Sequence, residues 1–198
     1  MVIRKELDRI IEKWHLLKHP FYEAWSDGTL SKEALQLYAS EYGNFIRLIP
    51  QGWSTIGDEA TAFEEEEHNE LWDSFAHGLN TTIGQPLLEE TSGLIGQTKE
   101  FFTKPAQALG ALYAFEIQQP ATSKSKLEGL RAHYSYPEDC ENYFKAHAGN
   151  WEESSRLAHA ISELDLPDQT LALEACEKTS IALWQALSGI HTNTGKMM

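Results

Sequence analysis

Cysteine is scarce in this sequence. Cys140 and Cys176 are the only two in 198 residues, and they do not form a Cys-x-x-Cys motif. Two thiols are too few for a disulfide scaffold, which is the usual framework of small secreted domains. We therefore expect a protein of the reducing cytoplasm, in which both cysteines are small buried side chains.

Positive charge and long apolar runs are also in short supply. Lysine and arginine number 16 against 30 aspartates and glutamates, which gives a formal net charge of -14. Such a surface repels the phosphate backbone of nucleic acids. A membrane-spanning helix needs about 18 consecutive apolar residues, and the sequence has no such run. We expect a soluble protein that binds neither nucleic acid nor membrane.

Alternating β-strand patterns are missing as well. Apolar residues recur every three or four positions almost throughout, which predicts helices. No Pro-, Gly- or Ser-rich linker divides the chain, so residues 1–198 are expected to form a single all-α domain, a bundle of about seven or eight helices. The predicted helices cover residues 3–17, 21–25, 31–49, 60–79, 86–103, 105–133, 137–164 and 167–190, with a kink or break expected at Pro50.

Three of these helices carry a potential metal ligand on an otherwise apolar face. The residues are Glu65 and His68, which form a Glu-x-x-His pair, Glu116, and His147. Glu65 belongs to the acidic run Glu64–Glu67, of which only one residue can face inward on a helix. A buried carboxylate is costly unless something pairs with it. The partner is a metal ion, another cation or a hydrogen-bond donor, and the pattern alone does not choose among them.

Several short motifs follow one another along nearly the whole chain. They are His19-Pro20-Phe21-Tyr22-Glu23-Ala24-Trp25-Ser26, Gln36-x-Tyr38-Ala39, His68-Asn69-Glu70-Leu71-Trp72, Leu112-Tyr113-Ala114-Phe115-Glu116 and Tyr143-Phe144-x-x-His147. This series resembles the TenA/PqqC-like superfamily, and within it the CADD-like branch. The resemblance implies the heme-oxygenase-like fold, a helical bundle with its site between the core helices.

The resemblance also implies a metal centre. Di-iron members of the superfamily use a Glu and a His, a Glu on the next core helix, and a His-x-x-x-Asp-x-x-His ladder on a later helix. His68, Glu116 and His147 match three of these positions. The first Glu corresponds either to Glu65 or, as in CADD-like members, to a position farther upstream near Glu59.

The ladder is incomplete in this sequence, because Trp151 and Ser154 stand where the family has Asp and His. A continuous helix places both on the face of His147, where an indole fills space and a hydroxyl is a weak ligand. Glu152 is one position off and needs a helix bulge to replace the Asp. We therefore expect one iron or manganese ion rather than two, with a metal-free site as the alternative. Trp151→Asp with Ser154→His is expected to raise iron occupancy.

Two tyrosines and a lysine extend the resemblance. CADD-like proteins of the Chlamydia type are thought to make para-aminobenzoate by oxidatively sacrificing their own tyrosine and lysine. Tyr22, Tyr38 and Lys126 fall at the matching positions and are the candidate catalytic residues. The simpler interpretation, favoured by the broken ladder, is two amphipathic core tyrosines and a solvated helix lysine.

Two functional hypotheses follow. The first is a CADD/PqqC-like oxidase that acts on a small organic substrate in a buried pocket, with Tyr42, Trp151 and Ser154 among the pocket residues. The second is a non-catalytic protein that binds a small molecule and has lost the metal. A TenA-like thiamin-salvage activity is disfavoured because the segment 113–116 lacks the cysteine nucleophile. The six Trp and seven Tyr, together with the family resemblance, also predict a homodimer.

Overall fold

The computed structural model describes residues 2–194, and every regular element within them is a helix. Eight helices have 12 residues or more: α1 (Val2–Lys13), α3 (Lys32–Ile46), α5 (Glu59–Gly78), α6 (Glu89–Phe101), α7 (Pro105–Glu116), α8 (Gln119–His133), α10 (Glu152–Glu163) and α11 (Leu166–Thr194). The shorter elements are α2 (Pro20–Ser26), α4 (Ile49–Thr55), α9 (Asn142–His147) and the 3-10 turns η1 (Leu16–Lys18) and η2 (Glu138–Glu141). The all-α prediction is confirmed.

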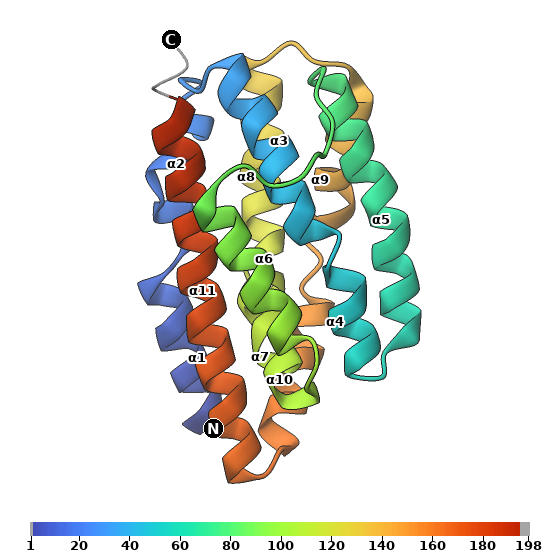
Figure 1. Cartoon of the computed structure of the whole chain (residues 1–198), viewed down its shortest axis with the longest axis vertical. Coiled ribbons are helices and arrows are strands. Elements are labelled where there is room, and N and C mark those ends of the chain that lie inside the picture. Colours follow the sequence, from blue (N-terminus) through green and yellow to red (C-terminus); the bar gives the residue numbers. More distant parts are fainter. Residues whose placement is uncertain (1, 195–198) are drawn as a thin grey trace.

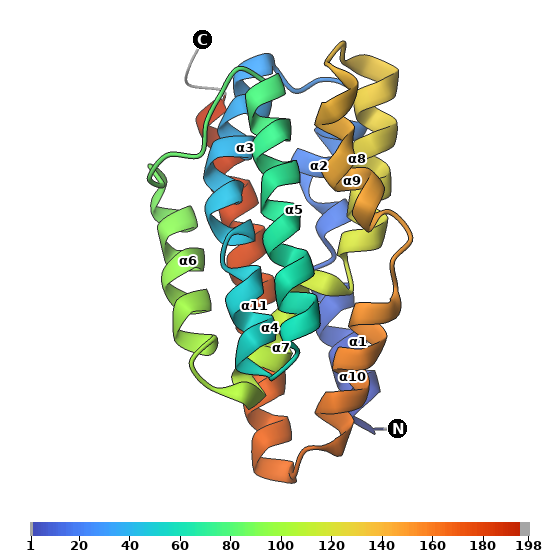
Figure 2. The ribbon, with the colours of Figure 1, turned by 90° about the vertical axis from the view of Figure 1, so that its right-hand side faces the viewer.

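The helices form an elongated bundle whose long axis α11 follows (Figure 1). α11 packs against α7, α6, α3 and α1, so it joins most of one side of the bundle. On the other side α5 packs against α3, α4 and α9 (Figure 2). Because α5 has core helices around it, side chains on its inner face point into the middle of the bundle.

Aromatic side chains make up much of the core. The fully buried ones include Trp25, Trp53, Trp72, Tyr22, Tyr38, Tyr42, Tyr113 and Tyr143. These rings are buried inside a single chain and are not available for a dimer interface. The number of Trp and Tyr residues is therefore the wrong argument for a homodimer as far as these rings are concerned. Trp151 differs, because half of its surface is exposed. The homodimer stays a prediction.

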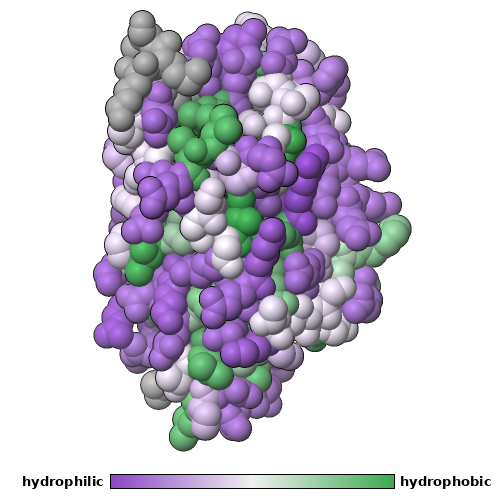
Figure 3. Space-filling model, viewed as in Figure 1, coloured by the Kyte–Doolittle hydropathy of each residue, from purple (hydrophilic) through white to green (hydrophobic). Residues whose placement is uncertain are grey.

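The outer surface agrees with the acidic composition. The face in Figure 3 is mainly hydrophilic, and hydrophobic side chains appear on it in small separate groups. Among the described residues no helix is both long and apolar enough to cross a membrane.

Local sequence signals set several helix boundaries. The Ser31 hydroxyl accepts a hydrogen bond from the Ala34 N–H at 3.2 Å, which caps α3 where the sequence predicts a helix start. Pro50 lies in the first turn of α4, after α3 has ended, so the predicted break is confirmed. The first helix ends at Lys13, earlier than the predicted range 3–17, and His19 caps α2, because its Nδ1 accepts from the Phe21 N–H at 3.0 Å.

The predicted helix 105–133 is in fact two helices. α7 ends at Glu116, and α8 begins at Gln119 with Pro120 in its first turn. Proline lacks the N–H that a continuous helix would need at that point. The break leaves Glu116 at the inner end of α7, in the middle of the bundle.

The predicted helix 137–164 is also broken, and this break changes the site. α9 ends at His147, Ala148 is extended, and Gly149 has a φ of 94°, a left-handed conformation that favours glycine. α10 starts only at Glu152. The prediction of one continuous helix through His147 and Ser154 is therefore wrong, because the local Ala-Gly-Asn sequence overrides the apolar periodicity.

Candidate active site

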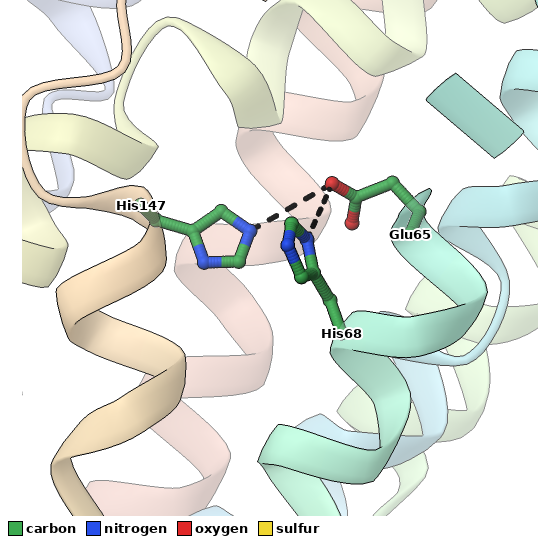
Figure 4. Close-up of side chains that lie close together, drawn as sticks. All are labelled: Glu65, His68 and His147. Atoms are coloured by element: carbon green, nitrogen blue, oxygen red, sulfur yellow. Dashed lines mark hydrogen bonds and ion pairs between the residues drawn. The ribbon is translucent and has the colours of Figure 1, made fainter. Parts of the chain in front are cut away.

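The structure brings Glu65, His68 and His147 together inside the bundle. Glu65 and His68 lie one turn apart on α5, and His147 is the last residue of α9; their side chains point toward one another (Figure 4). Their potential ligand atoms all lie within 4.8 Å of one another. Glu65 Oε1 is 3.0 Å from His68 Nδ1 and 3.7 Å from His147 Nε2. We call these three residues the Glu65 cluster.

Electrostatics keep Glu65 ionised despite its burial. Burial alone would raise the pKa of Glu65, but the nearby charges of His147 and His68 and the hydrogen bond with His68 outweigh it and lower this pKa to about 2. Burial lowers the pKa of His68, and the Glu65 carboxylate reverses the direction, so that it is raised overall. The cluster therefore offers one anionic oxygen and two imidazoles at one point.

Hydrogen bonding orients the His147 ring. Its Nδ1 lies 2.7 Å from the Tyr143 carbonyl oxygen, to which only an N–H can donate. In the neutral ring this leaves the lone pair on Nε2, which faces Glu65 and has no hydrogen-bond partner although it is buried. A ring nitrogen held in this way is the arrangement found at metal-binding histidines.

Glu116 lies beside the cluster but is not part of the 4.8 Å group. Its Oε1 accepts from Trp53 Nε1 at 3.4 Å, and its Oε2 is buried without a partner. Burial, followed by the negative charges of Glu65 and Glu153, raises the pKa of Glu116 well above its ordinary value. The unpaired Glu116 oxygen and the unpaired His147 nitrogen are the atoms that a cation would satisfy, so these residues fit a divalent ion such as iron or manganese.

Glu153 is a residue near the site that sequence analysis missed. It is 6% exposed in the first turn of α10, and Asn150 Nδ2 donates to its Oε1 at 3.1 Å. Burial and the neighbouring Glu65 charge raise the pKa of Glu153. Its neighbour Glu152, the residue considered as a ladder substitute, is exposed. Periodicity could not point to Glu153, because the helix break resets the faces of α10.

The structure also separates the two alternatives for the first ligand. Glu59 is exposed at the start of α5, where its carboxylate accepts from the Ser54 hydroxyl at 2.7 Å. Glu65 lies inside the bundle with His68 and His147. The geometry therefore favours Glu65 as the metal ligand.

Trp151 and Ser154 do not share a face with His147. Trp151 occupies the N-cap of α10 with half of its surface exposed, so its indole does not fill the space beside the histidine. Ser154 is buried, and its hydroxyl donates to the Trp151 carbonyl oxygen at 3.2 Å. The argument that Trp151 blocks a second ion is therefore wrong, because it relied on the continuous helix.

This geometry changes the expected effect of Trp151→Asp. An aspartate at the N-cap accepts hydrogen bonds from the first turn of α10, where Trp151 supplies no side-chain cap and Asn150 Oδ1 accepts from the Glu152 N–H at 3.2 Å. We expect Trp151→Asp to be more stable than Trp151→Ala by about 1 kcal/mol, measured by urea unfolding. Iron per chain, measured by elemental analysis, should equal that of the wild type. A rise in bound iron in Trp151→Asp would show that this position does face the metal.

Lys126 and two tyrosines form a second buried group. Lys126 is 1% exposed on α8, and its Nζ donates to the Tyr38 hydroxyl at 3.1 Å. The same nitrogen lies 4.9 Å from the centre of the Phe144 ring and 5.6 Å from that of Tyr22. The interpretation of Lys126 as a solvated helix lysine is therefore wrong. Burial lowers the pKa of Lys126 to about 7.

The tyrosines around Lys126 are protected from ionisation. Burial raises the pKa of Tyr22 to about 12, and burial followed by the neighbouring Tyr22 and Tyr42 raises the pKa of Tyr38 well above its ordinary value. The Tyr42 ring stacks on Tyr38 with centroids 5.1 Å apart. The amine and the phenols therefore meet as neutral groups at neutral to basic pH.

Ring contacts connect the Lys126 group to the Glu65 cluster. Tyr143 lies 4.2 Å from the His147 ring centroid and 4.8 Å from that of Trp72. Trp72 in turn lies 5.6 Å from Tyr38. The metal-type ligands and the tyrosine–lysine pair thus belong to one continuous interior.

Solved structures share this architecture over nearly the whole chain. A TenA homolog from Pseudomonas syringae pv. tomato has a TM-score of 0.78 at 14% identity, covering 96% of this chain and 93% of its own. A domain from Shewanella denitrificans, described as having a heme oxygenase-like fold, has a TM-score of 0.75 at 16% identity, covering 96% and 89%. The protein therefore has the heme-oxygenase-like fold that the sequence predicts.

Sequence comparison identifies the family. The TENA/THI-4/PQQC family model matches residues 4–78. A 4-aminobenzoate synthase from Nitrosomonas europaea is 32% identical, over 96% of this chain and 91% of the relative. Another from Chlamydia muridarum is 31% identical, over 90% and 86%. The chain belongs to the TENA/THI-4/PQQC family, together with these synthases.

Proposed function

We propose that this protein makes 4-aminobenzoate by oxidising one of its own buried tyrosines, Tyr22 or Tyr38, with nitrogen from Lys126. Two relatives that align over most of the chain are named for this product. The observation that carries the proposal is the 3.1 Å contact between Lys126 Nζ and the Tyr38 hydroxyl.

The atoms of the product explain why this contact matters. A tyrosine side chain has six ring carbons and a Cβ para to its oxygen, whereas 4-aminobenzoate has a carboxylate carbon para to a nitrogen. Lys126 Nζ lies beside the phenolic oxygen of Tyr38, the atom that nitrogen must replace. The Cα–Cβ bond of the tyrosine breaks, Cβ becomes the carboxylate and Cα stays in the chain. The phenolic oxygen leaves as water when Nζ bonds to the ring carbon, and the Cε–Nζ bond of Lys126 is broken by oxidation, which leaves Cε as an aldehyde. Dioxygen, as the oxidant, accepts the electrons and supplies carboxylate oxygen.

Burial makes both the Lys126 amine and the Tyr38 phenol suitable for this reaction. An amine attacks only as the neutral base, and desolvation lowers the pKa of Lys126 to about 7, so an appreciable fraction is neutral at physiological pH. Rings pack around the phenol, with Phe21 5.0 Å and Trp25 5.5 Å from Tyr38, and they exclude water from it. An oxidised ring is thereby protected from attack by solvent.

A metal would be held by Glu65, His68 and His147, with Glu116 beside them, and when bound it supplies the activation of dioxygen. Glu65 provides the negative charge that a cation needs, and the Tyr143 carbonyl fixes the ring of His147. Trp72 and Tyr143 fill the space between this cluster and Tyr38 with contacting rings.

A TenA-like hydrolytic function is less compatible with the thiols. Such chemistry needs a thiolate, and burial raises the pKa of Cys140 to about 11 and that of Cys176 to about 12. Both side chains are buried, Cys140 within η2 and Cys176 on α11. Neither is therefore an activated nucleophile.

Isotope labelling tests the proposed function. Protein made with ring-carbon-labelled tyrosine and side-chain-nitrogen-labelled lysine is expected to release 4-aminobenzoate that carries both labels after reduced metal and dioxygen are added. Mass spectrometry of the spent protein should find the loss at position 22 or 38. The variant at the consumed position, either Tyr22→Phe or Tyr38→Phe, should reduce product at least tenfold, because a phenyl ring lacks the para oxygen.

Tyr136→Phe is the matched control, because Tyr136 is partly exposed and lies outside the Lys126 group. It should form product at the wild-type level. Unlabelled product would rule out a self-derived tyrosine and favour an external substrate. Labelled product formed equally by all three variants would assign the source to a tyrosine other than Tyr22, Tyr38 and Tyr136. No product from a metal-loaded wild type would favour the non-catalytic binding protein.

A further inference from the structure

Polar side chains form a buried stripe along one face of α8. The residues are Gln119, Thr122, Ser123 and Lys126, and we call them the α8 stripe. They recur every three or four residues, as one face of a helix requires, and in chain order they are 3%, 3%, 0% and 1% exposed. A buried polar group is costly unless it is paired. The partners of the stripe therefore indicate what it does.

The two ends of the α8 stripe hold two tyrosines with groups of different chemistry. At one end Lys126 Nζ donates to the Tyr38 hydroxyl at 3.1 Å. At the other end, about two turns away, Gln119 Nε2 donates to the Tyr143 hydroxyl at 2.8 Å. Both tyrosines are 0% exposed, so water does not take the place of these partners. Tyr38 therefore faces an amine and Tyr143 faces an amide.

Tyr143 contacts the Glu65 cluster directly. Its ring centroid is 4.2 Å from that of His147, and its carbonyl oxygen accepts from His147 Nδ1 at 2.7 Å. Tyr38 is connected to the cluster through Trp72, which lies 5.6 Å from Tyr38 and 4.8 Å from Tyr143. An oxidation that begins at the cluster thus meets Tyr143 before Tyr38, yet the proposed reaction consumes Tyr22 or Tyr38. The site must spare Tyr143.

The Gln119 amide accounts for this selectivity. Oxidation of a phenol removes an electron and the hydroxyl proton, and the proton has to pass to a base at hydrogen-bond distance. Among residues 2–194 the hydrogen-bond partner of the Tyr143 hydroxyl is Gln119 alone, whose Oε1 accepts from the Ser123 hydroxyl at 3.4 Å. An amide is not a base at physiological pH and its nitrogen is not a nucleophile, whereas a neutral lysine amine is both.

We propose that Gln119 determines which tyrosine this protein consumes, because it holds Tyr143 with a group that neither accepts the phenol proton nor supplies nitrogen. Lys126 does both for the tyrosines beside it. This inference rests on the proposed function, since it concerns the choice of tyrosine in that reaction. It goes beyond that function by assigning the choice to two positions on one face of α8.

Exchanging the two ends of the α8 stripe tests the proposal. Gln119→Lys combined with Lys126→Gln keeps one amine and one amide in the interior and moves the amine from Tyr38 to Tyr143. With labelled tyrosine and lysine, reduced metal and dioxygen, the exchanged variant should form 4-aminobenzoate that carries both labels. The same bonds form and break as at Tyr38, so the spent protein should have lost the Tyr143 side chain and kept those of Tyr22 and Tyr38.

Two controls accompany the exchanged variant. Lys126→Gln alone has no amine at either phenol and should form no product. The Mn²⁺ affinity of the exchanged variant, measured from the electron paramagnetic resonance of the free ion, should stay at the wild-type level, because the α8 stripe supplies no residue of the Glu65 cluster. Retained affinity shows that the interior around the cluster is intact.

A second experiment needs neither metal nor 4-aminobenzoate. Photo-oxidised tris(bipyridine)ruthenium takes one electron from tyrosine in the metal-free protein, and mass spectrometry follows the loss of the unmodified peptide that contains Tyr143. In Gln119→His a neutral imidazole accepts the phenol proton, so Tyr143 should be lost at least about tenfold faster than in the wild type. Gln119→Leu removes the hydrogen bond without adding a base and should react as the wild type does. Tyr113, whose buried hydroxyl has no hydrogen-bond partner among the described residues, is the internal reference.

Equal loss of Tyr143 in Gln119→His and Gln119→Leu would show that Gln119 acts by packing alone and would overturn the proposal. An exchanged variant that binds Mn²⁺ normally but still consumes Tyr22 or Tyr38, or forms no product while the wild type does, would overturn it as well. A wild type that forms no 4-aminobenzoate would refute only the proposed function. Faster loss of Tyr143 in Gln119→His alone would then still show that Gln119 protects this tyrosine from oxidation.

Discussion

Replacing Lys126 with methionine is expected to make the protein more stable while it abolishes 4-aminobenzoate formation. Methionine has a similar length and no charge to desolvate, whereas the lysine ammonium is almost fully buried on α8. The pKa of Lys126 falls from 10.5 to about 7 on burial. Each unit of pKa shift corresponds to about 1.4 kcal/mol of desolvation cost, and contacts of the ammonium with the nearby rings and the Tyr38 hydroxyl offset part of this cost. The free energy of unfolding of Lys126→Met should therefore exceed that of the wild type by on the order of 3 kcal/mol below pH 7.

The stability difference between Lys126→Met and the wild type should depend on pH. Between about pH 7 and pH 10.5 the unfolded chain keeps the proton on Lys126 and the folded chain does not, so the stability of the wild type rises with pH over that window. Lys126→Met lacks this contribution. Its advantage over the wild type should therefore be largest below pH 7 and disappear near pH 10, measured by urea unfolding at a series of pH values.

Activity should follow the same group in the wild type. The neutral amine increases as the pH rises through about 7, so the initial rate of product formation should increase over that range. Lys126→Arg keeps a permanent charge and should give no product at any pH.

Lys124→Met, on the exposed face of α8, is the control for the stability measurement and should change the free energy of unfolding by less than about 0.5 kcal/mol. Equal effects of the two methionine variants would show that Lys126 carries no desolvation cost.

Periodicity predicted the helices well because it reports which face is buried. It placed α3, α5 and α11 to within a few residues, and Ser31 and Pro50 indicated the start of α3 and the break that follows it. It could not predict the break after His147, because the residues on both sides of the break are buried at helical spacing. Only the backbone conformation at Gly149 separates two helices from one.

A site residue could be predicted from the sequence where its burial depends on the face of a single helix. The run Glu64–Glu67 lies on an exposed face except for Glu65, as expected when a single residue of such a run turns inward. Glu153 and Lys126 depend on tertiary contacts instead. The burial of Lys126 results from α2 and α9 packing against α8 and from the Tyr38 side chain of α3, and the burial of Glu153 results from the turn between α9 and α10. No pattern within one segment carries that information.

Replacing Glu65 with glutamine is expected to remove both metal binding and product formation. Glu65 is the ionised member of the Glu65 cluster, and its Oε1 lies between His68 and His147. Glutamine keeps the size but offers a neutral oxygen, so a divalent cation loses its closest negative charge. Mn²⁺ affinity should fall on the order of 100-fold or more, and labelled 4-aminobenzoate should fall below detection.

Two neighbours on the same helix make this prediction specific. Glu67→Gln removes a charge from the exposed part of the acidic run, and Glu59→Gln removes the alternative first ligand, which bonds to Ser54 instead. Both variants should keep the Mn²⁺ affinity of the wild type to within about threefold, because exposed charges are screened by salt. Loss of Mn²⁺ binding in Glu59→Gln but not in Glu65→Gln would contradict this prediction. It would identify Glu59 as the metal ligand, which requires a different orientation of α5 in solution. The carboxylate that touches both histidines would then be only an ion-pair partner.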